Sequence, residues 1–138
     1  MSLSPQQVLE DVFGYSEFLG QQQSIIEAAL QGRDSLVIMP TGGGKSLCYQ
    51  IPALLREGTG LVVSPLIAWM QDQVTALREL GIEPEFLNSS QSPEERRVVM
   101  SKLRQGQLQL LYVAPERLVT EHTRSLLRDI PLSLIAIE

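Results

Sequence analysis

The chain has 138 residues and a formal net charge of −5, a length that suits one domain of ordinary size. Apolar residues make up 43% and charged residues 20%, which is globular composition and excludes a disordered tail. The single cysteine, Cys48, excludes a disulfide framework and a cysteine-rich zinc site. The apolar runs are much shorter than a membrane span, and the first residues do not resemble a secretory leader. We therefore expect a soluble, cytoplasmic protein.

Helices and buried strands alternate along the chain. In chain order, the pattern predicts a helix over 6–13, a helix over 21–31, a strand over 35–39, a helix over 45–56, a strand over 60–64, a helix over 67–80, a strand over 83–88, a helix over 93–105, a strand over 108–114, a helix over 115–129 and a strand over 132–137. Ser4 and Ser92 are expected N-caps, and Gly32 and Gly81 are expected helix ends. Five strands joined by helices predict an α/β fold, a parallel sheet with helices on both faces.

The strongest local motif lies where the strand over 35–39 meets the following helix, and reads Met-Pro-Thr-Gly-Gly-Gly-Lys-Ser over 39–46. Glycines at this point let backbone N–H groups surround a phosphate chain, and the helix N-terminus favours the same anion. Lys45 would reach the β- and γ-phosphates, and the Ser46 hydroxyl would hold Mg²⁺. Met39 occupies the position of the first glycine in the general pattern, which points to a subclass of phosphate loops. The motif predicts binding of ATP with Mg²⁺.

With the loop placed, segments on both sides of it form a recognisable series. They are Phe13-Gly14-Tyr15, Phe18, Gln22, Ile25-Ile26, Gly32-Arg33-Asp34, the segment over 39–53, Val63-Ser64-Pro65-Leu66-Ile67, Asp72-Gln73, Leu87-Asn88-Ser89 and the segment over 111–118. From about Phe13 to Ile137, the chain resembles the first motor domain of RecQ-type DNA helicases, in superfamily 2. This resemblance implies a RecA-like P-loop fold and ATP-driven 3′-to-5′ unwinding of DNA.

The resemblance also implies roles for individual residues. Gln22 resembles the glutamine that reads the adenine edge, where an amide can donate and accept at once. Tyr15 resembles the aromatic residue that stacks on the adenine ring. The nucleotide-binding set implied by the motifs is Tyr15, Gln22, Thr41, Gly42, Gly43, Gly44, Lys45 and Ser46, with Lys45 and Ser46 in the catalytic role and Ser46 on the metal. The set that resembles DNA-contacting segments is Ser64, Pro65, Leu66, Asn88, Ala114, Pro115, Glu116 and Arg117, through contacts mainly to phosphates.

Three departures from the family pattern stand out. Leu19-Gly20-Gln21 replaces the usual arginine, proline and glycine, so no guanidinium stacks on the adenine. Gln71 stands where a lysine is common, which removes one possible phosphate contact. The family's Asp-Glu-Ala-His segment follows a strand like 134–137, and here only Glu138 stands at or next to its first acidic position. The acidic pair that positions Mg²⁺ and the attacking water is therefore missing or reduced to one glutamate.

These observations predict the ATP-binding portion of a RecQ-like helicase, ending before the Asp-Glu-Ala-His segment and without the second motor domain. We expect the chain alone to bind nucleotide with little hydrolysis. Two alternatives remain open, a non-catalytic truncated gene product and another P-loop NTPase such as a small kinase. The expected partners are ATP and single-stranded or partly duplex DNA, with no membrane.

Several single side chains can be interpreted as either structural or functional. For Trp69, packing under a loop is favoured over stacking on a base. For Arg117, a contact with DNA and a salt bridge with Glu116 or Glu121 remain equal alternatives. His122 is expected at the surface and Cys48 as a small buried thiol.

Overall fold

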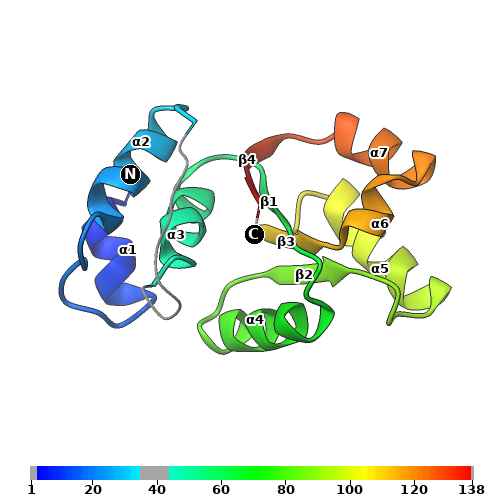
Figure 1. The fold of residues 1–138 in the computed structure, drawn as a ribbon, viewed down its shortest axis with the longest axis horizontal. Coiled ribbons are helices and arrows are strands. Elements are labelled where there is room, and N and C mark those ends of the chain that lie inside the picture. The colour runs from blue at the N-terminus through cyan, green and yellow to red at the C-terminus, as the bar shows by residue number, and fades with distance from the viewer. Residues whose placement is uncertain (1–2, 35–43, 138) are drawn as a thin grey trace. The chain divides into compact units, whose positions relative to one another are not determined.

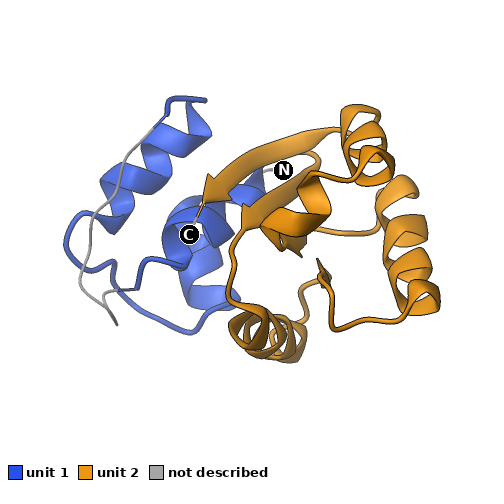
Figure 2. Ribbon diagram, turned by 45° about the vertical axis from the view of Figure 1, so that its right-hand side comes forward, with its two compact units in different colours: residues 1–56 blue, residues 57–138 orange. Residues whose placement is uncertain are grey.

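A computed structural model describes residues 3–34 and 44–137 of the chain. The chain divides into two compact units, Met1–Arg56 and Glu57–Glu138 (Figure 2). Each unit has its own cluster of buried apolar side chains. The expected strand over 35–39, together with Thr41, Gly42 and Gly43, lies outside the described residues.

The described residues of the first unit form three helices: α1 (Pro5–Asp11), α2 (Gln22–Leu30) and α3 (Leu47–Leu55). The predicted start of α1 is confirmed, because the Ser4 side chain accepts from the Gln7 backbone N–H at 3.2 Å and Pro5 takes the first helical position. Gly32 follows α2 in a left-handed conformation, as its expected role at the helix end requires. The core of the unit consists of four buried side chains and their apolar neighbours: Val8, Leu9, Ile26 and Ile51.

The second unit is an α/β structure around a parallel sheet (Figure 1). In chain order its elements are β1 (Thr59–Val63), α4 (Ile67–Glu79), β2 (Pro84–Leu87), α5 (Pro93–Arg104), β3 (Leu110–Val113), α6 (Pro115–Leu118), α7 (Glu121–Arg128) and β4 (Leu132–Ile137). The four described strands lie in the order β2-β3-β1-β4, and every pair is parallel. The α/β fold and the parallel pairing predicted from the alternating pattern are confirmed for this unit.

Helices pack against both faces of the sheet. Successive side chains of a strand point to opposite faces, so neighbouring residues of one strand contact different helices. On one face, Leu61, Leu111 and Val113 pack into a cluster with side chains of α5 and α7. Tyr112, which alternates with them, meets Trp69 of α4 edge-on, with the ring centroids 5.6 Å apart. Trp69 therefore packs, as favoured, but against a side chain of the sheet and not under a loop.

The helix predicted over 115–129 is wrong as one element, since the chain forms two helices, α6 and α7. The break lies at Val119 and Thr120, and Thr120 takes an extended conformation with ψ of 134° as the N-cap of α7. The Thr120 hydroxyl donates to the Arg117 carbonyl at 2.8 Å. Side-chain bonds of this kind offer the backbone an alternative to helical hydrogen bonding, which explains why the apolar spacing alone misplaced the boundary.

Candidate nucleotide and nucleic-acid sites

The described end of the phosphate loop leads directly into α3. Gly44 has φ of +77°, a left-handed conformation that glycine adopts without the steric cost of a Cβ atom. Lys45 and Ser46 are half-buried, and the Cys48 N–H donates to the Lys45 carbonyl at 3.0 Å as the first turn of the helix forms. The Ser46 side chain makes no capping hydrogen bond with the described backbone of α3.

Gln22 of α2 contacts this loop directly. Its side chain is 2% exposed, its Oε1 accepts from the Leu19 N–H at 2.8 Å, and its Nε2 donates to the Gly44 carbonyl at 3.1 Å. A carboxamide also has a second N–H and a second lone pair beyond these two hydrogen bonds. The structure thus joins the expected adenine residue to the phosphate loop by a hydrogen bond that the sequence did not predict.

Tyr15 and Leu19 expose their side chains in the same unit. The Tyr15 N–H donates to the Leu9 carbonyl at 3.1 Å, which fixes the backbone while the ring, 57% exposed, stays at the surface. An exposed ring on a fixed backbone is suited to stacking on a base.

Magnesium requires hard oxygen ligands and usually keeps several waters and nucleotide phosphates in its shell. The Ser46 hydroxyl fits this requirement as a single protein ligand. Within residues 3–34 and 44–137, no group of three His, Cys, Asp or Glu side chains gathers in a way that could hold a metal ion.

The residues expected to contact DNA meet at the carboxyl edge of the sheet. Val63 and Leu87 both pair in register with Val113, so the residues that follow them, Ser64, Asn88 and Ala114, lie abreast. The Ser64 N–H donates to the Val113 carbonyl at 3.1 Å, and the Ala114 N–H donates to the Leu87 carbonyl at 3.0 Å. The parallel topology therefore brings together three segments that are far apart in the sequence.

Exposure differs among these residues. Pro65, Leu66, Pro115 and Glu116 are exposed, whereas Ser64 and Ala114 are buried. The Ser64 hydroxyl accepts from the Leu66 N–H at 3.2 Å, so this side chain shapes the turn before α4.

Asn88 is also fully buried, at 0% exposure. Its Oδ1 accepts from the Ser90 N–H at 2.9 Å, so the side chain is engaged by its own loop. A side chain held in this way cannot reach DNA unless the loop opens.

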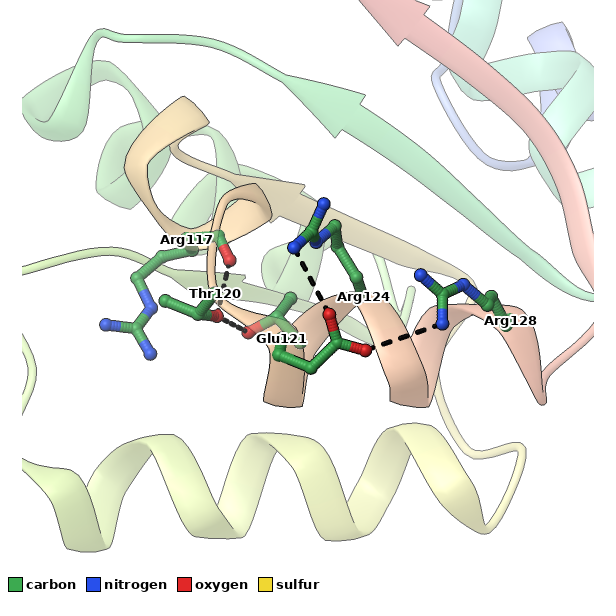
Figure 3. A network of polar contacts seen from close by, with 6 residues as sticks. Arg117, Thr120, Glu121, Arg124 and Arg128 are labelled. Atoms are coloured by element: carbon green, nitrogen blue, oxygen red, sulfur yellow. Dashed lines mark hydrogen bonds and ion pairs between the residues drawn. The ribbon is translucent and has the colours of Figure 1, made fainter.

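Arg117 lies in α6 beside a polar network (Figure 3). The structure pairs Glu121 with Arg124 at 3.2 Å and with Arg128 at 3.5 Å, and no ion pair joins Arg117 to Glu116 or Glu121. Its buried Nε atom has no hydrogen-bond partner within the described part of the chain. Of the two alternatives weighed for Arg117, the salt bridge is wrong, and the contact with DNA stays a prediction.

His122 and Cys48 have the exposure that the sequence predicts. His122 is exposed and Cys48 is buried. Burial raises the pKa of the Cys48 thiol, which disfavours the reactive thiolate. No helix in the described ranges is long and apolar enough to cross a membrane.

Comparisons with known proteins agree with the motif series. The family model described as DEAD/DEAH box helicase matches residues 20–137. The chain is 53% identical to the ATP-dependent DNA helicase RecQ of Haemophilus influenzae over 131 residues, which is 95% of this chain and 21% of that relative. It is 45% identical to the ATP-dependent DNA helicase RecQ of Bacillus subtilis over 134 residues, 96% of this chain and 23% of that relative.

A plant helicase is also similar to most of the chain, which again covers only a small share of that relative. The chain is 51% identical to the ATP-dependent DNA helicase Q-like 2 of Arabidopsis thaliana over 109 residues, 78% of this chain and 16% of that relative. The chain thus spans about a fifth of the length of the curated relatives it matches. With the family model covering most of its residues and its relatives of the RecQ type, the chain belongs to the DEAD/DEAH box helicase family, whose motor domains have the RecA-like α/β fold.

Proposed function

We propose that the chain is the ATP-binding portion of the first motor domain of a RecQ-like 3′-to-5′ DNA helicase. Such an enzyme couples ATP hydrolysis to DNA unwinding, and we place it in recombination and repair in the cytoplasm. The observation that carries this proposal is the contact between Gln22 and Gly44 at the loop that ends in Lys45 and Ser46. It joins an expected adenine residue to an expected phosphate site within one compact unit.

At this site each side chain has a distinct task. Lys45 binds β- and γ-phosphate oxygens, and the backbone N–H groups around Gly44 bind the same phosphate chain. Ser46 holds Mg²⁺, which neutralises phosphate charge when bound. Gln22 reads the adenine edge and Tyr15 stacks on its ring, as their counterparts are expected to do in the family.

Single-stranded DNA is the proposed partner of the carboxyl edge in the second unit. The exposed residues there are Pro65, Leu66, Pro115 and Glu116, with Arg117 half-buried beside them. Contacts from such strand ends go mainly to phosphates through backbone N–H groups and hydroxyls, and therefore carry little sequence information.

For the 138-residue polypeptide by itself we propose nucleotide binding with little hydrolysis. Its sequence supplies no Asp-Glu-Ala-His segment. Phosphoryl transfer depends on positioning and charge around Mg²⁺, so a reaction without the acidic pair is expected to be severely slowed.

A hydrolysis assay tests this proposal. Phosphate release from Mg-ATP is measured with and without single-stranded DNA for the unsubstituted chain, for Lys45→Ala and for Lys102→Ala, which removes the only other lysine. The proposal predicts rates near background for all three and no stimulation by DNA. DNA-stimulated hydrolysis that disappears only in Lys45→Ala would contradict the proposed dependence on the acidic pair.

A further inference from the structure

Helices α2 and α3 are joined by a hydrogen bond at each end. At the N-terminal end, Gln22 of α2 donates to the Gly44 carbonyl at 3.1 Å, in the loop that leads through Lys45 into α3. At the C-terminal end, Arg56, the C-cap of α3, donates through Nη1 to the Ala29 carbonyl of α2 at 3.1 Å. The two helices therefore run in the same direction, and the residues of the proposed nucleotide site lie at one end of the pair.

Arg56 supplies α2 with a charge that its own last turn lacks. That turn has no basic residue, although the carbonyl groups at a helix C-terminus carry partial negative charge. The Ala29 carbonyl accepts from the Gly32 N–H at 3.0 Å, and its second lone pair accepts from the Arg56 guanidinium. A charged donor at this carbonyl stabilises the end of α2 and ties it to α3.

The position of Arg56 is itself set by α3. Its N–H donates to the Pro52 carbonyl at 3.0 Å, and its backbone is extended with ψ of 151°, so the helix ends at this residue. The residue is half-buried, and a hydrogen bond from a charged donor is stronger than one between neutral groups. Arg56 lies outside every segment of the motif series, so the resemblance to RecQ-type helicases assigns it no role.

Between their two ends, the helices share one apolar cluster. Ile26 of α2 and Ile51 of α3 both belong to it, and each is 0% exposed. Gln22 lies one turn before Ile26, about 6 Å along the helix axis, and Ala29 lies almost one turn after it. Apolar burial is not directional, so this cluster holds the helices together without fixing the tilt of α2 about Ile26. The two terminal hydrogen bonds fix that tilt, and loss of the one at Ala29 would displace Gln22.

We propose that Arg56 is a positioning residue for adenine recognition, which holds α2 against α3 so that the Gln22 amide reaches both Gly44 and the base. The inference rests on the proposed nucleotide function and adds a residue at the far end of the helix pair. Lys45 and Ser46 directly precede α3, so phosphate binding is independent of the tilt of α2. Arg56 therefore governs the part of the affinity that comes from the base.

Binding of the full chain to Mg-ATP, Mg-GTP and Mg-tripolyphosphate measures the base and phosphate parts of the affinity separately. Arg56→Ala should weaken binding of Mg-ATP about three- to tenfold, a usual range for a residue that acts through packed neighbours. The preference for ATP over GTP should fall by a similar factor, and binding of Mg-tripolyphosphate, which has no base, should stay unchanged. The matched control without any change is Arg104→Ala, which removes an exposed arginine from the last turn of α5 in the second unit.

A conservative variant and a double-mutant cycle separate positioning from general stability. Arg56→Lys keeps a charged donor at the same helix end and should restore most of the affinity for Mg-ATP. If Arg56 acts through Gln22, then Arg56→Ala should cause no further loss in the Gln22→Ala background. If Arg56→Ala is unfolded in a thermal melt, Arg56→Met, which keeps the apolar stem of the side chain, takes its place in each comparison.

An unchanged preference for ATP over GTP in Arg56→Ala would overturn this inference and leave the proposed function intact. Equal losses for Mg-ATP and Mg-tripolyphosphate, or additive losses in the cycle, would give Arg56 a general structural role and overturn its positioning role. Absence of Mg-ATP binding or of base preference in the unsubstituted chain would instead overturn the nucleotide part of the proposed function, and this inference with it.

Discussion

Individual residues in the first unit show how a ligand site depends on a few backbone positions. Gly44 has positive φ, and a Cβ atom built on it would collide with Nε2 of Gln22. The same amide donates to the Gly44 carbonyl. Gly44 therefore adopts the left-handed turn at no steric cost, and a side chain there would displace the Gln22 amide.

Replacing Gly44 by alanine tests both effects. Gly44→Ala should lower the free energy of unfolding by about 1–2 kcal/mol for the left-handed backbone, and further for the displaced Gln22 amide. The matched control is Gly32→Ala in the same unit, since Gly32 has φ of +75° but open space around a Cβ. Urea denaturation measures the free energy of unfolding of both variants. An equal decrease in Gly44→Ala and Gly32→Ala would contradict a specific contact between residue 44 and Gln22.

Arg117 is the charged residue whose expected DNA role can be tested in isolation. Arg117→Ala should weaken binding of single-stranded DNA and lower the slope of log affinity against log salt by about one. Arg97→Ala, which removes an exposed arginine of α5, serves as the control. An unchanged salt slope for Arg117→Ala would assign this residue a structural role.

At the scale of elements, capping determines where α5 begins. Ser92 Oγ accepts from the Glu95 N–H at 3.1 Å, and Glu95 accepts from the Ser92 N–H at 3.0 Å. Hydrogen bonds from Ser92 lower the pKa of Glu95. A carboxyl group with a lowered pKa in the folded state adds stability above its unfolded pKa, and this stability is lost as the pH falls.

The Glu95→Gln variant isolates that pH dependence, because glutamine keeps the hydrogen bond without the charge, as Gln7 does in α1. The unsubstituted chain should be more stable than Glu95→Gln at pH 7, and the difference should disappear as the pH falls below the ordinary carboxyl pKa of 4.5. Ser92→Ala should cost about 1 kcal/mol at neutral pH. A difference that stays constant between pH 7 and pH 3 would contradict the role of the carboxylate.

The elements that sequence could predict are those set by local chemistry. The starts of α1 and α5 follow from Ser4 and Ser92, and strands β1, β3 and β4 follow from apolar runs. The single helix over 115–129 was wrong because the Thr120 hydroxyl competes for the backbone, which apolar spacing does not register.

Contacts between residues far apart in the chain could not be predicted from the sequence. Glu85 on β2 is paired with Arg78 of α4 at 2.8 Å and with Lys102 of α5 at 2.9 Å, although nothing local links these charges. The contact between Gln22 and Gly44 and the buried state of Asn88 likewise depend on tertiary packing.

For the whole molecule, the net charge of −5 is compatible with DNA binding because the proposed contacts are local. They use backbone N–H groups, hydroxyls and Arg117 at one edge of the sheet, and do not require a basic surface overall. The residues of the proposed nucleotide site belong to the first unit and those of the proposed DNA edge to the second. The two proposed binding functions can therefore be tested by separate variants of the full chain.

The most direct test of the account is a thermal melt with and without Mg-ATP, since a ligand raises the midpoint only when it binds the folded state. At a concentration about 100 times the Kd, Mg-ATP should stabilise the unsubstituted chain and Lys102→Ala by about 2.7 kcal/mol. Lys45→Ala should show little or no shift. An equal shift in Lys45→Ala, or no shift in the folded unsubstituted chain, would contradict a nucleotide site built on Lys45 and Ser46.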